Sequence, residues 1–207
     1  LVGPKMAEFV AEGKRILHEH QAAYITMHCW RGGMRSKSMA TLSNFAGIPT
    51  LTITGGYKVY RNAVQQSFAN PLHLIVLGGK TGSAKTAILQ ALQQQGEQII
   101  DLEKLANHKG SAFGQLGEDP QPSSEYFENL LFEKIQQLDS TKRIWIEDES
   151  HLIGKVFIPE TFWEQMRNAQ VIYCDFPIEE RINYLVTTYG NFDHEGVIES
   201  VKRITKK

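Results

Sequence analysis

A single cysteine, Cys29, stands at the start of a short glycine-rich loop that could hold a reactive thiolate. An apolar run over residues 23–27 predicts a buried parallel strand before the loop, and a helical pattern begins at Ser36. The loop itself carries Arg31, Arg35 and two adjacent glycines. Helix N-termini, inward-turned backbone N–H groups and guanidinium groups all stabilise an anion. We therefore expect a depressed pKa and a nucleophilic thiol at Cys29; a buried structural cysteine is the alternative.

A second stretch, GGKTGSAKT at residues 78–86, nearly matches the phosphate-binding pattern G-x-x-x-x-G-K-[ST]. In such a loop, backbone N–H groups surround a phosphate, Lys85 reaches the outer phosphate and Thr86 can bind Mg²⁺. Ala84 stands where the pattern has glycine, and its methyl group restricts the backbone. A glycine-rich turn without a ligand is the alternative. The residues expected to bind a phosphate-bearing ligand are Gly79, Thr81, Gly82, Ser83, Ala84, Lys85 and Thr86.

Three consecutive acids follow an apolar strand pattern over residues 143–146. Acids at the end of such a strand help to hold Mg²⁺ in P-loop proteins. The sequence does not decide which of Glu147, Asp148 and Glu149 has this role, and a solvated charge cluster is the alternative. The seven histidines show no spacing typical of metal ligands, so we assign no protein-held metal site.

Other residues have weaker claims to a function. Trp30 follows the cysteine directly and could stack on a base or a hydrophobic substrate, or form a wall of the loop. Cys174 lies in an apolar strand pattern, which favours packing over chemistry. Four polar residues could contact phosphate, although isolated basic residues usually face solvent: His108, Lys109, Ser111 and Arg181.

The composition is typical of a globular protein. The chain has 207 residues, of which 42% are hydrophobic and 22% charged, enough for one large domain or two small ones. No apolar run approaches the roughly 20 residues that a membrane span needs, so no membrane partner is expected. Only two cysteines are present, which argues against a disulfide framework and favours the reducing cytoplasm. The chain begins with Leu1 rather than methionine, so we expect a longer native protein.

The charged residues are unevenly distributed. Residues 20–96 contain seven Lys and Arg but no Asp or Glu, whereas residues 97–207 carry a net charge of −8. The acid-free segment contains both anion-binding motifs. We therefore expect a polyanionic partner, which is a phosphorylated small molecule, a nucleic acid or both; compositional chance is the alternative.

Strand and helix patterns alternate along the chain, which predicts an α/β fold. The break at Asn70-Pro71 predicts a domain over residues 1–70 and a second, doubly wound parallel domain over residues 71–207. The first domain has too few strands to close a good sheet, and we expect the missing strands to precede Leu1. Helices are expected over residues 6–20, 36–45, 57–68, 86–94, 127–138, 162–167, 178–189 and 194–206. Further strands are expected over residues 50–53, 72–77, 98–101 and 171–174, with a long loop over residues 106–124.

In six stretches the sequence resembles the bacterial tRNA 2-selenouridine synthase family, in which a rhodanese-like domain is joined to a P-loop domain. The matching stretches are CWRGGMRS at residues 29–36, GGYKVYR at 55–61, GGKTGSAKT at 78–86, HKGSAFG at 108–114, QPS at 121–123 with Phe127-Glu128, and IEDESHLIG at 146–154. The chain departs from the family pattern at Ala84, where glycine is usual, and at Lys109, where arginine is usual. The first half of the rhodanese-like domain has no counterpart in the chain.

The resemblance implies a tRNA-modifying transferase. Its substrate is the 2-thiouridine at the wobble position of tRNA, whose sulfur is replaced by selenium from selenophosphate. The replacement passes through an S-geranylated intermediate made from geranyl diphosphate. Cys29 then carries selenium as a perselenide, with Arg31 and Arg35 in the same catalytic loop, and the P-loop binds a phosphate-bearing donor. A tRNA backbone suits the acid-free segment.

Two other classes of function stay open. One is a different cysteine enzyme: five residues separate Cys29 from Arg35, the spacing with which cysteine-dependent phosphatases and arsenate reductases grip an oxyanion, and another sulfurtransferase also needs such a thiol. The fused P-loop argues against a phosphatase. The other class is a nucleotide-switched tRNA-binding module without catalysis, in which the thiol loop is vestigial.

Overall fold

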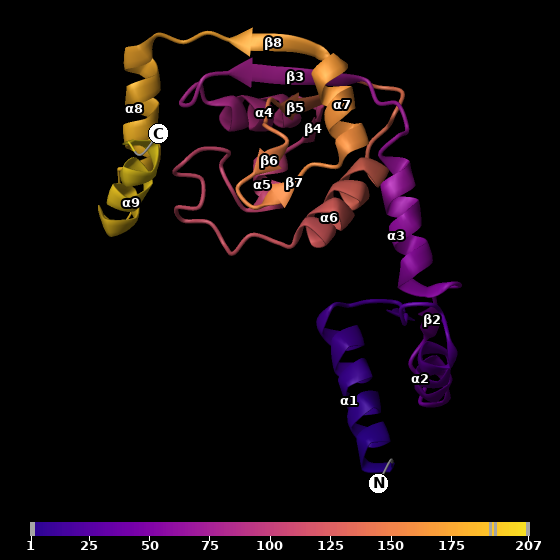
Figure 1. Cartoon of the computed structure of the whole chain (residues 1–207). Helices are drawn as coiled ribbons and strands as arrows, with labels where there is room; N and C mark the ends of the chain where they lie inside the picture. Colours follow the sequence, from indigo (N-terminus) through magenta and orange to yellow (C-terminus); the bar gives the residue numbers. More distant parts are fainter. Residues whose placement is uncertain (1–2, 191, 193, 206–207) are drawn as a thin grey trace. The chain divides into compact units, whose positions relative to one another are not determined.

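The computed structural model describes residues 3–190, 192 and 194–205. It divides into two compact units, Leu1–Val64 and Gln65–Lys207, which are described one at a time (Figure 1). Within the described ranges, every helix is too short or too polar to cross a bilayer.

The first unit contains two parallel strands and the helices around them. Its elements are α1 (Gly3–Glu19), β1 (Ile25–Met27), α2 (Met34–Phe45), β2 (Thr50–Thr52) and most of α3 (Gly56–Ser67). The strands pair in parallel from Ile25 opposite Thr50 to Met27 opposite Thr52. Ile48 is buried at 1% exposure and lies against Gly13 of α1, where a Cβ would come within 3.0 Å of the Ile48 side chain. The assignment of this unit as part of a rhodanese-like domain stays a prediction.

The second unit is built on a four-stranded parallel sheet in the order β4-β5-β3-β8. Its strands are β3 (Leu74–Gly79), β4 (Gln98–Ile100), β5 (Ile144–Glu147) and β8 (Gln170–Cys174), with a small antiparallel pair of β6 (Leu152–Ile153) and β7 (Val156–Phe157). Its helices are α4 (Lys85–Gln94), α5 (Leu102–Ala106), α6 (Ser124–Gln136), α7 (Glu160–Asn168), α8 (Ile178–Tyr189) and α9 (His194–Thr205).

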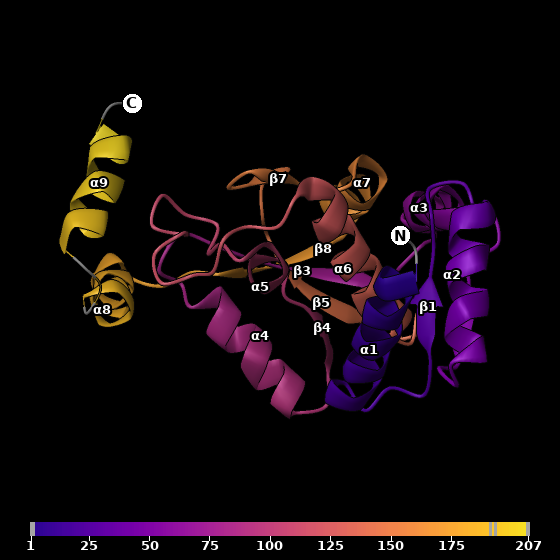
Figure 2. The same ribbon diagram turned by 90° about the horizontal axis from the view of Figure 1, so that it is seen from below.

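Helices cover both faces of this sheet. On one face, Leu77 and Ile99 pack against Leu89 of α4. Because successive side chains of a strand point to opposite faces, Val76 and Ile146 lie on the other face, where both are fully buried. Figure 2 shows α4 on one side of the sheet and α6 and α7 on the other. The predicted doubly wound parallel arrangement is therefore present in the second unit.

The boundary between the units lies within α3 rather than at the predicted Asn70-Pro71 break. The reason is that Phe68 packs with the second unit, its ring centroid lying 6.2 Å from that of Phe162. The Gln165 amide also donates to the backbone oxygens of Phe68 and Asn70. The turn that reads as a domain break is thus held by side chains of α7.

Two features of the second unit were not predicted. The short helix α5 follows β4 directly, and the Asp101 side chain caps it by accepting from the Lys104 N–H at 2.8 Å. The β6–β7 hairpin turns at Gly154, whose φ is +60°. Both elements are too short for a hydrophobic period to reveal them.

Candidate functional site

The Cys29 thiol lies at the N-terminus of α2, as the strand–loop–helix pattern predicted. The backbone N–H of Gly33, the residue that caps α2, donates to the Cys29 Sγ at 2.9 Å. The Ser36 hydroxyl, in the first turn of α2, lies 3.4 Å from the same Sγ. The thiol is half-buried and therefore open to reagents. The loop thus holds a sulfur atom between a helix N-terminus and a hydroxyl donor.

These hydrogen bonds lower the pKa of Cys29 to about 7. The Ser36 hydroxyl is the largest cause, followed by the backbone N–H of Gly33, with smaller help from the backbone of Ser36 and Arg31. The sequence predicted backbone N–H groups and the guanidinium charges of Arg31 and Arg35 as causes. The backbone N–H of Gly33 contributes as predicted, the charges of the two arginines are not among the causes, and the Ser36 hydroxyl was not predicted. Both arginines are exposed; Arg35 lines the hollow beside the thiol, and Arg31 contributes its backbone N–H.

The glycines of this loop allow the start of α3 to lie directly against it. The backbone nitrogens of Tyr57 and Lys58 donate to the carbonyl oxygens of Cys29 and Trp30, both at 3.0 Å. A Cβ on Gly56 would come within 2.3 Å of the Cys29 carbonyl oxygen, so no larger residue fits there. The GGYKVYR stretch is therefore part of the cysteine site.

The P-loop curls between β3 and α4 as its sequence predicted. The Lys85 Nζ donates to the Gly79 carbonyl oxygen at 3.3 Å, and Ser83 is almost fully buried. Gly82 has a φ of +85°, and a Cβ there would lie 2.7 Å from the Arg181 carbonyl oxygen. Ala84, directly before α4, takes a left-handed conformation with φ +56° and ψ +29°. This conformation explains why the phosphate-binding pattern prefers glycine at that position.

The strain at Ala84 predicts that Ala84→Gly stabilises the chain. A left-handed conformation costs an L-residue about 1–2 kcal/mol, which glycine avoids. The greater conformational freedom of glycine in the unfolded chain reduces this gain in stability by about 0.4–1 kcal/mol. We expect the free energy of unfolding in urea to rise by about 0.5–1 kcal/mol. The matched control is Ala87→Gly inside α4, which should lower it by about 1 kcal/mol. A loss of stability in Ala84→Gly would contradict this account.

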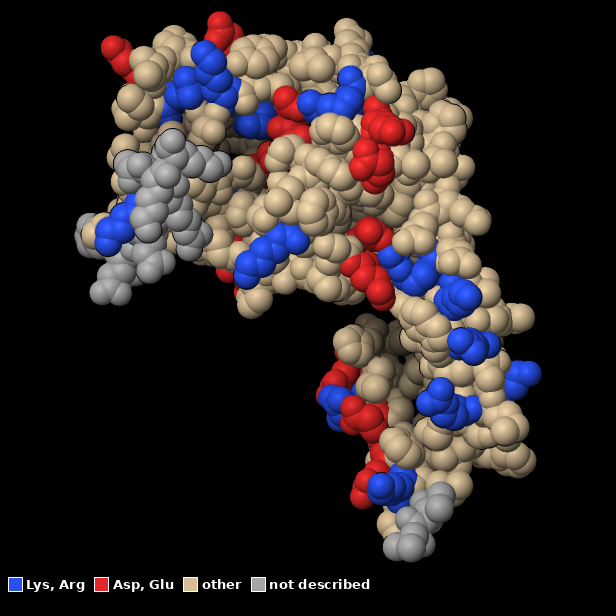
Figure 3. All heavy atoms as spheres, viewed as in Figure 1, with Lys and Arg blue, Asp and Glu red and all other residues tan. Residues whose placement is uncertain are grey.

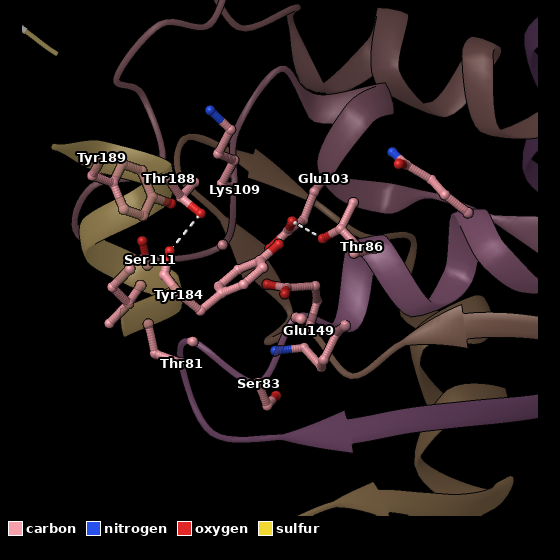
Figure 4. A pocket seen from close by; sticks show the side chains of 17 residues that line it. Thr81, Ser83, Thr86, Glu103, Lys109, Ser111, Glu149, Tyr184, Thr188 and Tyr189 are labelled. Atoms are coloured by element: carbon pink, nitrogen blue, oxygen red, sulfur yellow. Dashed lines mark hydrogen bonds between the residues drawn. The ribbon is translucent and has the colours of Figure 1, made fainter. Parts of the chain in front are cut away.

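A cavity of about 230 Å³ opens beside the P-loop. Figure 4 shows its walls: the P-loop and α4 on one side, the loop at residues 109–111 and helix α8 on the other. The Arg181 Nε donates to the Thr81 carbonyl oxygen at 2.9 Å, which ties α8 to the P-loop. Six of the seven predicted phosphate-binding residues line this cavity, and Gly79 does not: Thr81, Gly82, Ser83, Ala84, Lys85 and Thr86.

Two carboxyl groups lie inside this cavity, beside Lys85 and Thr86. Glu103, from α5, accepts a hydrogen bond from the Thr86 hydroxyl at 2.8 Å (Figure 4). Glu149 lies next to it, and a Cβ on Gly110 would come within 2.7 Å of carboxylate oxygens of both acids. Burial, with the neighbouring Glu103 carboxyl second, raises the pKa of Glu149 to about 8. Burial also raises the pKa of Glu103. At neutral pH the pair therefore retains a proton.

The three acids at the end of β5 have three different surroundings. Glu149 lines the cavity. Glu147 is fully buried and accepts the Glu103 N–H at 2.9 Å, and burial raises its pKa well above the usual range. Asp148 forms an ion pair with Arg167. Of the three, Glu149 is thus the acid that lines the cavity together with Thr86.

The retained proton on Glu149 predicts a pH-dependent stability. Between the usual carboxyl pKa and about 8, folded Glu149 holds a proton that the unfolded chain releases, so its contribution to stability falls as pH rises through that range. The glutamine side chain in Glu149→Gln is uncharged at every pH, so the variant does not lose stability at this position as pH rises. We expect it to raise the free energy of unfolding by roughly 1–3 kcal/mol at pH 8.5 relative to wild type, and by much less at pH 5.

The measurement is urea denaturation of both proteins at the two pH values. Asp148→Asn is the control, because it removes a carboxylate of the same strand end that lies outside the cavity. The assigned proton on Glu149 is wrong if the free energies of unfolding of Glu149→Gln and wild type differ by the same amount at pH 5 and at pH 8.5.

Of the four weaker phosphate candidates, two line the cavity and two do not. Lys109 and Ser111 line it, but the Lys109 Nζ already pairs with Glu118 at 2.7 Å. Arg181 supports the P-loop backbone instead. His108 lies between Gly114 and Gly154, where a Cβ on either glycine would meet its ring. It is a packing residue rather than a ligand contact.

Comparison with known proteins decides the family. A model of the tRNA 2-selenouridine synthase AAA domain matches residues 72–204, more than half of the chain. The chain belongs to the tRNA 2-selenouridine synthase family. The resemblance found in the sequence is therefore confirmed.

Curated tRNA 2-selenouridine synthases match along most of the chain. The protein from Shewanella piezotolerans is 36% identical over 191 residues, which cover 90% of this chain and 50% of that protein. The protein from Nitrosomonas europaea is 35% identical over 179 residues, which cover 84% and 46%. The chain thus spans about half the length of the curated relatives it matches. Among solved structures, TT1252 from Thermus thermophilus aligns with a TM-score of 0.38 and 18% identity over 65% of this chain and 81% of that one, too weak a likeness to carry an argument.

The sequence analysis missed several lining residues of this tRNA 2-selenouridine synthase family member. One of them, Glu103, could have been found, because it follows β4 and the carboxyl ends of parallel strands meet at one edge of a sheet. The remaining wall comes from α8, about a hundred positions from the P-loop. Its lining residues are Tyr184, Leu185, Thr188 and Tyr189.

Proposed function

We propose that this chain contributes to a tRNA-modifying transferase that replaces the sulfur of wobble 2-thiouridine by selenium. The relatives it matches are named tRNA 2-selenouridine synthase. The single observation that carries the proposal is the Cys29 site, where hydrogen bonds from Ser36 and Gly33 lower the thiol pKa to about 7, so that a large fraction of the sulfur is ionised at neutral pH. A soft thiolate of this kind is suited to carry selenium: its S–Se bond would form as the P–Se bond of selenophosphate breaks, and the phosphorus would leave with that electron pair as phosphite.

The P-loop cavity is the proposed site for geranyl diphosphate. Lys85 and the backbone N–H groups of the loop are suited to hold the diphosphate and to stabilise its charge as it leaves. The apolar parts of Tyr184, Leu185 and Tyr189 form the opposite wall and offer contacts to a prenyl chain. The raised pKa of Glu149 supports this role, because a protonated carboxyl does not repel a diphosphate. The product of this step is the S-geranylated 2-thiouridine.

Mg²⁺ would fit at the same place. It binds through one or two carboxylates together with phosphate oxygens and waters, and does not need a cage of protein ligands. Among the described residues, no cluster of three or more His, Cys, Asp or Glu forms such a cage. Thr86 with Glu103 or Glu149 would hold the ion, which would neutralise charge on the diphosphate. Binding of the ion would release the proton that the two carboxyls retain.

A tRNA partner suits the charges of the first unit. Arg31, Arg35, Lys37 and Lys58 are exposed there, and no acid lies between Glu19 and Glu97 in the sequence. In Figure 3, basic side chains lie over α2, whereas the acidic side chains of this unit lie over α1. Such a surface binds a phosphate backbone with an affinity that falls as salt rises.

The experiment that tests the proposal measures 2-selenouridine by mass spectrometry in cellular tRNA. The cells lack their own 2-selenouridine synthase and express the gene that encodes this chain, either wild type or Cys29→Ala. We expect 2-selenouridine with the wild type and none with the variant. Equal levels in both would overturn the proposal. Hydrolysis of an aryl phosphate that disappears in Cys29→Ala would instead favour a cysteine-dependent phosphatase.

A further inference from the structure

An aromatic cluster lies beside the Cys29 thiol. The rings of His28 and Tyr57 stack with centroids 5.2 Å apart and planes inclined by 24°. The Trp30 ring lies 5.8 Å from Tyr57 at 48°. The backbone hydrogen bonds from Tyr57 and Lys58 to the cysteine loop fix the start of α3 against these rings. The position of the aromatic cluster relative to the cysteine loop is therefore fixed by backbone hydrogen bonds.

The cluster and the thiol share one hollow. His28, Cys29, Trp30 and Arg35 all line a surface hollow of about 650 Å³. This volume is within the roughly 300–1,000 Å³ range of small-molecule sites. Trp30 leaves 53% of its surface exposed, although a large aromatic side chain gains stability from burial. Trp30 therefore offers a flat, partly exposed aromatic surface at the edge of the hollow that contains the thiol.

The charges around the hollow indicate what this ligand is. Arg35 lines the hollow, and Arg31 and Lys37 are exposed nearby in the sequence, whereas residues 20–96 contain no acid. A flat aromatic surface next to cations is the combination that binds single-stranded nucleic acid, because bases stack on the rings while phosphates meet the charges. RNA bases are reached by such sites only when they are unstacked, as in loops.

We infer that Trp30, supported by Tyr57 and His28, is a positioning residue that stacks on one unstacked pyrimidine base of RNA and holds it beside the Cys29 sulfur. The inference rests on the proposed function, in which that base is the wobble uridine. Beyond that function, the inference names the side chain that contacts the base.

The test compares two RNA probes with the whole chain: an anticodon stem–loop with wobble 2-thiouridine, and the same stem–loop with an abasic wobble position. Affinity is measured by anisotropy of labelled RNA. We expect wild type to prefer the first probe by about 5- to 150-fold, the range for one base stacked on an aromatic side chain. Trp30→Ala should bind both probes equally, and Trp30→Phe should restore most of the preference. Tyr24→Ala is the matched control, because Tyr24 is also 53% exposed in the same unit but lies outside the hollow.

A second readout follows the thiol. The 2-thiouridine probe should slow alkylation of Cys29 by iodoacetamide in wild type, and the abasic probe should not. In Trp30→Ala, neither probe should slow it more than the other. A Trp30→Ala protein that still prefers the 2-thiouridine probe as strongly as wild type would overturn the inference alone. A wild-type chain that binds neither probe would overturn the inference together with the proposed tRNA substrate.

Discussion

Cys29→Ala is expected to stop the formation of 2-selenouridine while S-geranylated 2-thiouridine still forms. The thiol is the proposed selenium carrier, and loss of a nucleophile that forms a covalent intermediate costs more than about 10³-fold in rate. The proposed geranyl transfer depends on the P-loop cavity, whose lining does not include Cys29. Nucleosides from 2-thiouridine tRNA incubated with protein, selenophosphate and geranyl diphosphate should show the geranylated product accumulating.

Cysteine reactivity provides the control for this result. Cys174→Ala should leave both products unchanged, since Cys174 packs against the core cluster of Leu77, Leu89 and Ile99. In wild type, alkylation of Cys29 should reach half its maximal rate near pH 7, rather than near the usual thiol pKa of about 8.5. Ser36→Ala should move that midpoint to higher pH, because the Ser36 hydroxyl is the largest cause of the lowered pKa. Wild-type levels of 2-selenouridine in Cys29→Ala would refute the assigned role.

Lys85→Ala is expected to block the earlier step, with neither product formed and 2-thiouridine left unmodified. The Lys85 ammonium is half-buried, lies 3.3 Å from the Gly79 carbonyl oxygen and lines the cavity. Removal of a partly buried charge that pairs with a ligand phosphate costs about 2–5 kcal/mol, which weakens binding by about 30-fold or more. Inorganic diphosphate binding, measured by calorimetry, reports this loss without the need for turnover.

Lys80→Ala is the matched control, with the same substitution in the same loop. Lys80 is exposed and does not line the cavity, so its loss should change diphosphate affinity by less than about threefold. Equal effects of the two substitutions would show that the diphosphate binds elsewhere. If the Lys85→Ala protein still makes the geranylated product, the P-loop is not required for geranyl transfer.

The parts of the fold that the sequence predicted are those set by local patterns. Helix α8 begins and ends at the predicted Ile178 and Tyr189, because its apolar period and its glycine stop are both local. The P-loop and the cysteine loop were also predicted, since each is one short stretch whose residue types fix its backbone. The α5 helix and the β6–β7 hairpin were missed because neither is long enough to show a period.

The missed parts of the site depend on contacts between distant segments. The contact of Arg181 with Thr81 joins residues a hundred positions apart, and no spacing within either segment reveals it. The same holds for the pair of Glu103 and Glu149, which the sheet brings together from two different strand ends. The largest cause of the lowered Cys29 pKa, the Ser36 hydroxyl, was also missed, because residue types do not show where a hydroxyl group points.

The short hydrogen bonds to the Cys29 sulfur make the pKa of this thiol insensitive to ionic strength. Dissolved ions screen charges that lie about a Debye length apart, roughly 8–10 Å under ordinary conditions, but do not reach between a sulfur and donors at 2.9 and 3.4 Å. Salt at a concentration that would weaken binding of RNA to the basic surface is therefore expected to leave the Cys29 pKa near 7. The proposed RNA binding and the ionisation of the sulfur therefore depend on separate interactions, and salt is expected to weaken only the first.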